Sequence, residues 1–315
     1  MSRLRARSAV APAVASIVAM TLGLALATTG APPASAAISD VYYERALMVA
    51  ADTRCGLFTP DIASALAAAT FQARGGALRA GIETEALAAI ADQARARAAA
   101  TACKAPQLLT VAARVRDAFK GYGRLLRMDF PGDTASWKAD RSLPRYVPVW
   151  RLSQTSSLSG KAGSDAVTFG LAGMWGAPQK LVAVADFGDE ESPYAARLVV
   201  RDAVRAPQPY LKLLRTSSAA SLPLRARTPP PSATLVFAAE ARGPADPTLN
   251  PAGVRSAMAF RFPAAAAEAI AVLDPREAMT IEFLYAGRRG DVIRKAYIEV
   301  GDFAAGRAFL AASKR

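Results

Sequence analysis

The spacing of hydrophobic residues changes from a helical period to a strand period part-way along the chain. Over residues 38–122 apolar positions recur every three or four residues, and alanine, which has the highest helix propensity, is abundant. The expected helices lie near residues 40–54, from Pro60, from about Glu83 and after Pro106. Gly75 and Gly76 are expected to bend or break the second helix. We therefore predict an alanine-rich helical bundle over residues 38–122.

Apolar and polar residues alternate over short runs in the second half of the chain, which is the period of a β-strand. The expected strands are residues 149–152, 166–171, 181–186, 196–201, 234–240, 256–262, 279–285 and 294–300. Two helices are expected among them, at residues 264–273 and at 303–312, where Asp302 is a candidate N-cap. The pattern predicts a mainly antiparallel, sandwich-like β domain over residues 149–315, with inserted and C-terminal helices.

A polar stretch punctuated by proline and glycine separates these two parts, and we predict a linker over residues 123–148. The fold class expected is therefore α+β. Within the second part, residues 181–202 and 280–302 share a pattern of strand, polar turn and strand. The match lies in pattern rather than identity, so an internal duplication stays an open alternative.

The first 37 residues have the pattern of a secretory signal peptide. Arg3, Arg5 and Arg7 precede an apolar stretch over residues 9–27, and small residues around Ala36 suit cleavage near Ala36 or Ala37. An uncleaved membrane anchor is the alternative, since the apolar stretch is about long enough to cross a bilayer. We expect a periplasmic or secreted protein that has no transmembrane segment after cleavage.

The chain has two cysteines, Cys55 and Cys103, and each falls at the expected end of a helix. In an oxidising compartment a lone pair of cysteines favours a structural disulfide. This bridge would tie the first expected helix to the third. Closure of so long a loop would stabilise the fold by about 4 kcal/mol in the chain-entropy description.

Basic residues outnumber acidic residues by 39 to 26, but they are dispersed and most are arginine. This bias accompanies the high alanine content and suits a GC-rich genome. A basic exported protein favours anionic partners. We expect the partner to be an envelope protein or an anionic envelope component, and we do not expect nucleic acid.

Histidine is absent from the chain, which excludes catalysis by a Ser-His-Asp or Cys-His arrangement and zinc sites of the usual kind. If both cysteines are bridged, no thiolate nucleophile remains. We identify no catalytic, cofactor-binding or metal-ligating residue and expect no cofactor. The weak candidates for a polar or ion-binding loop are Asp186, Asp189, Glu190 and Glu191, for which a solvated hairpin turn is the favoured interpretation.

The sequence resembles exported proteins of GC-rich Gram-negative bacteria that have no established activity. The resemblance rests on the signal segment, the helical region with Cys55 and Cys103, and the closing residues 299–310. It implies no site residue. We expect a cell-envelope protein with a non-catalytic binding or structural role. The alternative is a carboxylate-dependent hydrolase of envelope glycans, which needs two facing acidic side chains roughly 5–10 Å apart.

Overall fold

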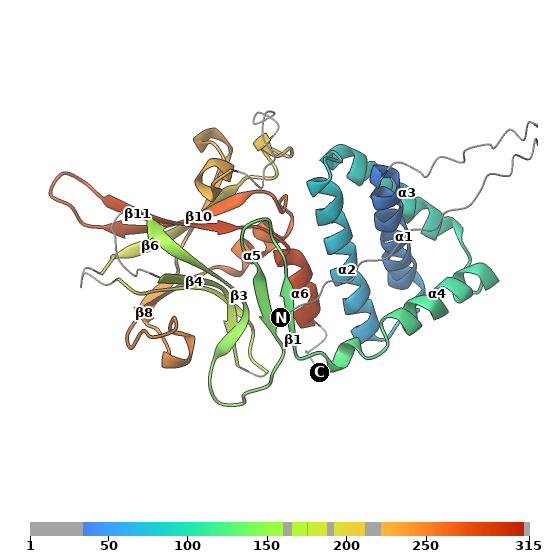
Figure 1. Ribbon diagram of the computed structural model, residues 1–315, viewed down its shortest axis with the longest axis horizontal. Helices are drawn as coiled ribbons and strands as arrows, with labels where there is room; N and C mark the ends of the chain where they lie inside the picture. Colours follow the sequence, from blue (N-terminus) through green and yellow to red (C-terminus); the bar gives the residue numbers. More distant parts are fainter. Residues whose placement is uncertain (1–33, 160–165, 175, 188–191, 212–221, 312–315) are drawn as a thin grey trace, which may run out of the picture. The chain divides into compact units, whose positions relative to one another are not determined.

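The computed structural model describes residues 34–159, 166–174, 176–187, 192–211 and 222–311. These residues form a group of N-terminal helices followed by an antiparallel sheet with two further helices (Figure 1). The α+β class is therefore confirmed. The predicted signal segment lies outside the described residues up to residue 33, and residues 34–37 belong to the first helix.

Six α-helices occur in the described ranges, and most begin and end where the sequence predicts. They are α1 (Ala34–Cys55), α2 (Pro60–Arg79), α3 (Thr84–Ala100), α4 (Pro106–Ala118), α5 (Ala264–Ala271) and α6 (Phe303–Ala311). Proline at the first position starts α2 and α4, because its missing N–H would have no partner there. Gly81, with φ of +87°, follows α2 and ends it.

The expected break at Gly75 and Gly76 is wrong, since α2 runs through both residues. A Cβ atom on Gly75 would lie 3.0 Å from Asp302 Oδ1 and 3.2 Å from Arg79 Nη1. Because Gly75 has no side chain, α2 can pack closely against the start of α6. The glycine does not break the helix.

The helical bundle is confirmed in part. α1 packs against both α2 and α3, whereas α4 has little contact with the other three and α2 also lies along α6. The disulfide between Cys55 and Cys103 is present, with the two Cα atoms 5.6 Å apart, and it joins the end of α1 to the segment after α3. Beside it, Arg54 donates hydrogen bonds to the carbonyl oxygens of Ala98 (2.7 Å) and Thr101 (2.6 Å).

The sheet has eleven strands within the described residues, and all of its neighbouring strands are antiparallel. The strands are β1 (Arg127–Phe130), β2 (Trp137–Asp140), β3 (Val149–Ser159), β4 (Ala166–Gly173), β5 (Lys180–Ala185), β6 (Ala195–Arg201), β7 (Thr234–Ala238), β8 (Ala241–Pro244), β9 (Met258–Phe262), β10 (Ala278–Tyr285) and β11 (Val292–Glu299). Every predicted strand is present. β1, β2 and β8 are additional.

The predicted sandwich is wrong, because the strands form one curled sheet that closes about halfway into a barrel. Its order is β7-β6-β10-β11-β3-β4-β5-β9-β8, with β2 pairing with β3, and β1 with β2. β3 joins the two parts of the sheet because it pairs with β4 and, through Leu158 and Ser159, with β11. The single stretch 234–244 supplies both terminal strands, β7 and β8. Alternation along a strand marks its two faces but does not show whether the inner faces belong to one sheet or two.

The segment expected to be a linker contains β1 and β2, which extend the sheet at β3. The expected domain boundaries at residues 122 and 149 remain a prediction. β5 and β6 are not paired with each other, since β5 lies between β4 and β9 while β6 lies between β10 and β7. The segment between them is therefore a crossing connection, in contrast to the hairpin of β10 and β11.

Aromatic side chains fill the inside of the curled sheet. The rings of Phe187, Phe260 and Phe283 meet edge to face, and those of Trp137 and Phe303 do the same. Trp137 is fully buried and its Nε1–H donates to the carbonyl oxygen of Val300 at 2.9 Å. The core therefore reaches from the strands to α6.

Candidate ligand-binding groove

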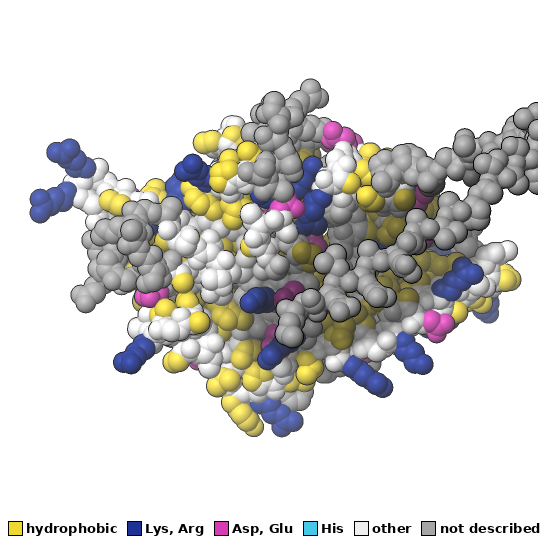
Figure 2. Space-filling model, in the orientation of Figure 1, with side chains coloured by type: hydrophobic (Ala, Val, Ile, Leu, Met, Phe, Trp, Pro, Cys, Tyr) yellow, Lys and Arg dark blue, Asp and Glu magenta, His cyan; other side chains and the backbone are white. Residues whose placement is uncertain are grey.

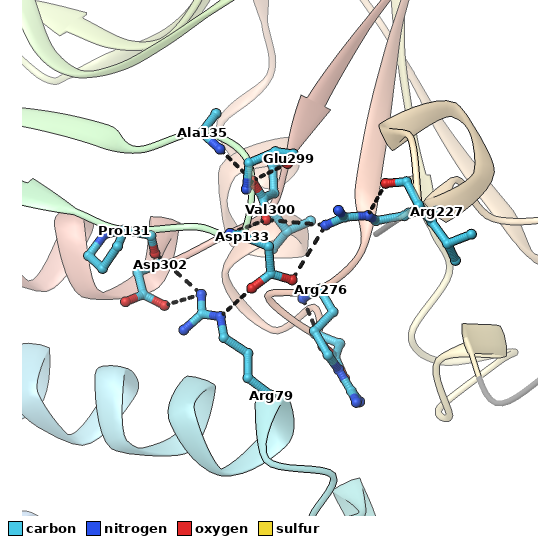
Figure 3. Close-up of polar contacts among 12 residues, drawn as sticks. Arg79, Pro131, Asp133, Ala135, Arg227, Arg276, Glu299, Val300 and Asp302 are labelled. Atoms are coloured by element: carbon cyan, nitrogen blue, oxygen red, sulfur yellow. Dashed lines mark hydrogen bonds and ion pairs between the residues drawn. The ribbon is translucent and has the colours of Figure 1, made fainter. Parts of the chain in front are cut away.

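A buried network of ion pairs joins the end of α2 to the sheet (Figure 3). Arg79 binds Asp133 (Nε to Oδ1, 3.1 Å) and Asp302 (Nη2 to Oδ1, 2.9 Å). The side chain of Arg227 is fully buried, and its Nη1 lies 3.4 Å from carboxylate oxygens of both Asp133 and Glu299. Because these charges are withdrawn from water, their mutual pairing offsets much of the cost of burial.

The turn after β1 encloses the carboxylate of Glu299. The N–H of Asp133 donates to Oε1 (2.6 Å), and the N–H groups of Thr134 and Ala135 donate to Oε2 (2.9 and 2.8 Å). A Cβ on Gly132 would lie 2.6 Å from Oε2, so glycine is required for this close approach. With both oxygens bound to donors, Glu299 acts as an anchor for the turn.

A further buried ion pair joins the end of β6 to the residue before β10. The Nε–H of Arg201 donates a bifurcated hydrogen bond to both carboxylate oxygens of Glu277 (3.0 and 2.9 Å), and Nη2 donates to Oε1 (2.8 Å). Both side chains are buried. Burial raises the pKa of Glu277 although Arg201 opposes this rise. Burial also raises the pKa of Asp302, and the charge of Arg79 offsets only part of the effect. Each of these carboxylates is thus held by an arginine.

Contacts at both ends fix α6 in place. Asp302, immediately before the helix, is held by Arg79. Near the other end, Arg141 Nε donates to the carbonyl oxygen of Phe309 (2.7 Å), and the Ser64 hydroxyl donates to that of Ala308. The network therefore positions the side chains along α6, including Arg307.

Arg307 lies at one wall of a groove with a volume of about 520 Å³. The groove is bounded by α5, α6, β3 and the turn between β4 and β5. Its lining residues are Leu143, Arg151, Leu171, Met174, Gly176, Ala177, Pro178, Gln179, Leu181, Ala264, Ala267, Glu268 and Arg307. Leu171, Leu181 and Ala267 are buried core residues that supply an apolar floor, while Leu143 and Met174 are exposed at the mouth.

Arg151 places a buried cation at this groove. Its Nε donates to the carbonyl oxygen of Gly173 (3.2 Å), and its Nη1 donates to the carbonyl oxygens of Asp140 (3.5 Å) and Ser142. Its Nη2 makes no hydrogen bond to any described residue. Burial lowers the pKa of Arg151, and the nearby charge of Asp140 opposes the change. An arginine stays protonated under such a shift, so the groove holds a fixed positive charge.

The second arginine of the groove is neutralised by its own neighbour. Arg307 donates to Glu268 through Nη1 (3.1 Å) and Nη2 (2.5 Å), and to the carbonyl oxygen of Ala267 (2.9 Å). Glu268 is the one carboxylate among the described lining residues. The net charge of the lining is therefore positive. Its combination of apolar floor and cationic wall suits a ligand with an apolar part and an anionic part.

Of the four acidic residues predicted as a weak ion-binding loop, only Asp186 belongs to the described structure, and it is not among the lining residues of this groove. Asp186 is half-buried after β5, and its N–H donates to the carbonyl oxygen of Ala166. Asp189, Glu190 and Glu191 lie outside the described residues. In the ranges that the structure describes, no three Asp, Glu or Cys side chains gather in a way that could hold a metal ion.

The tryptophans have different positions. Trp137 belongs to the core, Trp150 is half-buried with its Nε1–H donated to the carbonyl oxygen of Leu249 (3.1 Å), and Trp175 lies outside the described residues.

The sequence alone does not single out Arg151 or Arg307. Arginine occurs throughout the chain, and a strand and a helix far apart in sequence supply these two.

Helices of the described part are all too short or too polar to cross a membrane. No protein-family model matches the chain, and neither the curated proteins nor the solved structures include one similar to it.

Proposed function

We propose that this protein is exported to the cell envelope and there binds, without catalysis, an anionic and partly apolar envelope component. The observation that carries the proposal is the groove at α5 and α6, where Arg151 is fixed beside an apolar floor. Its volume of about 520 Å³ lies in the range of small-molecule sites, roughly 300–1,000 Å³. Export is supported by the signal-like sequence and by the disulfide, which is typical of oxidising compartments.

The hydrogen-bond donors in the groove indicate the chemistry of the ligand. Guanidinium N–H groups suit the oxygens of a carboxylate or phosphate. Arg151 is held by three carbonyl oxygens and leaves Nη2 for such a group. The apolar floor favours a ligand with an attached hydrocarbon portion. A lipid with an anionic headgroup has both parts.

Binding is a better proposal for this groove than glycan hydrolysis. Hydrolysis by two carboxylates needs an acid and a base or nucleophile at the same open site. Glu268 is the one carboxylate among the described lining residues, and it is paired with Arg307. The buried carboxylates of the network, Glu299 above all, are occupied by hydrogen-bond donors.

The test is calorimetric titration of the purified chain from residue 38 at low salt. The main probe is lysophosphatidylglycerol below its micelle concentration, compared with lysophosphatidylcholine. Lipopolysaccharide and peptidoglycan fragments serve as further anionic probes. We expect the anionic lysolipid to bind more tightly than the zwitterionic one. If none of the anionic probes binds, the proposal is wrong.

A matched pair of variants assigns the binding to the groove. Leu143→Glu adds a negative charge at the mouth, and Leu125→Glu adds the same charge elsewhere; the two leucines are 49% and 44% exposed. We expect Leu143→Glu to weaken binding of the anionic lysolipid about tenfold, which corresponds to about 1.4 kcal/mol, and Leu125→Glu to leave it unchanged. Equal effects of the two variants would contradict a groove site.

A further inference from the structure

The hairpin of β10 and β11 extends beyond the neighbouring strands and projects from the sheet (Figure 1). Its last cross-strand pair is Tyr285 with Val292, and residues 286–293 are all exposed. This tip shares no residue with the groove lining. It is thus a separate surface.

The tip is basic. Residues 286–295 contain four basic residues and one acidic residue, and Figure 2 shows basic side chains at the end of the hairpin. Arg288 and Arg289 are exposed and form no ion pair with any described residue. The acidic residue, Asp291, is close enough to the Tyr194 hydroxyl to raise the pKa of Tyr194. The two arginines are therefore available to an anionic partner.

Apolar side chains accompany these charges on both faces of the hairpin. Val292 and Ile293 are 55% and 38% exposed, and adjacent residues in a strand point to opposite faces. Tyr194, beside the hairpin, is 46% exposed. A solvent-facing hairpin normally places polar residues at such positions. The exposed apolar pair thus offers contact surface on both faces of the hairpin.

Ion pairs and a cation–π contact connect the strands at the base of the hairpin. Glu282 accepts from Arg197 (2.5 Å) on one neighbouring strand and lies 2.9 Å from Lys295 on the other. The guanidinium carbon of Arg294 lies 4.5 Å from the centre of the Tyr285 ring. These contacts join β6, β10 and β11 to one another at the base of the projecting tip.

We propose that the tip of the β10–β11 hairpin docks on an anionic phospholipid surface. Arg288 and Arg289 bind headgroup phosphates, while Val292, Ile293 and Tyr194 enter the interfacial layer. A bilayer interface surrounds an inserted tip on both faces, whereas a protein surface covers one face, so the two-sided apolar exposure favours lipid. Basic residues are attracted to anionic lipid and apolar side chains add to the binding.

The experiment is co-sedimentation of the chain from residue 38 with vesicles of phosphatidylcholine that do or do not contain phosphatidylglycerol. We expect binding to the anionic vesicles and a loss of that binding at high salt. The double variant Arg288→Ala/Arg289→Ala should weaken vesicle affinity by roughly tenfold or more, since each basic residue near an anionic surface contributes roughly fivefold. Val292→Ser/Ile293→Ser, which keeps the charge, should also weaken it.

The matched control is Arg114→Ala/Arg124→Ala, which removes two exposed arginines elsewhere in the chain. Equal losses from the control and hairpin variants would show that dispersed charge is responsible and would overturn the proposal. Absence of binding to anionic vesicles would do the same.

Leu143→Glu separates this proposal from the proposed function. If it abolishes lysolipid binding but retains vesicle binding, the groove and the hairpin are independent sites, as expected. If vesicle binding is lost in Leu143→Glu and kept in Arg288→Ala/Arg289→Ala, lipid is bound through the groove and the hairpin proposal is wrong.

Discussion

The carboxylate of Glu299 is enclosed by a turn that lies far from it in the sequence. Burying an ionised group is costly unless it is paired and hydrogen-bonded. Here three backbone N–H groups and the Thr134 hydroxyl donate to Glu299, and Arg227 lies beside it. The residue therefore uses its charge to hold the turn after β1 against the end of β11.

Glu299→Gln is expected to lower the free energy of unfolding by about 3 kcal/mol or more, because breaking a buried charge interaction leaves unpaired groups behind. The new amide NH₂ would also face N–H donors. The measurement is urea denaturation followed by circular dichroism. Glu240→Gln is the control, since Glu240 is 53% exposed and 3.9 Å from Arg261; it should change stability by less than about 0.5 kcal/mol. Similar values for the two variants would refute the anchoring role.

At the scale of elements, α2 packs against two different helices. One side packs against α1, and the other lies along α6. Ser64 binds a carbonyl oxygen near the end of α6, and Arg79 binds the residue immediately before its start. The glycine at position 75 allows this approach. The sequence of α2 predicts a member of the helical bundle. In the structure α2 also supports α6, which forms one wall of the groove.

Gly75 and Gly76 offer a matched test of this close packing. Replacing a helical glycine by alanine normally stabilises a protein, by about 0.4–1 kcal/mol. Gly76→Ala is expected to show this gain, since nothing lies within 4 Å of the added Cβ. Gly75→Ala should lose the gain or become destabilising, because its Cβ would press on Asp302. Thermal and urea unfolding measure both; an equal gain in the two variants would mean that α2 and α6 do not pack closely.

For the whole molecule, two devices connect segments that are distant in sequence. The disulfide and Arg54 connect α1 to the end of α3, and the buried arginines connect α2 to the sheet. The sheet in turn is continuous through β3, and the stretch 234–244 reaches both of its ends. The helices and the strands therefore support one another through a few strong polar links in addition to apolar packing.

Cys55→Ala/Cys103→Ala tests the first of these devices. Loss of the bridge is expected to lower the free energy of unfolding by about 2–4 kcal/mol, because the unfolded chain gains freedom. The folded helix content should persist, since Arg54 still binds the end of α3. Urea denaturation and far-ultraviolet circular dichroism give the two readouts, and reduction of the unmodified protein should cause the same loss. A variant as stable as the unmodified protein would contradict this account.

Local pattern alone predicted much of the secondary structure. The prolines at positions 60 and 106 marked helix starts, and alternation marked strands such as residues 279–285, because both signals are contained within a few neighbouring residues. The short strands β1 and β2 were not predicted, because the prolines and glycine around them are typical of a linker. The break expected at Gly75 was wrong because the neighbour that explains this glycine, Asp302, is remote in the sequence.

The sequence by itself determined the α+β class, the disulfide partners and the absence of imidazole chemistry, since composition and short-range spacing are enough for these. Only the tertiary structure decided that the strands form one curled sheet, that Glu299 is an anchor, and that Arg151 and Arg307 share a groove. Each of these depends on which distant segments pair. The type of a residue and its near neighbours in the sequence indicate whether its side chain is charged and whether it lies on a buried face. The residues that it contacts depend on how the whole chain packs.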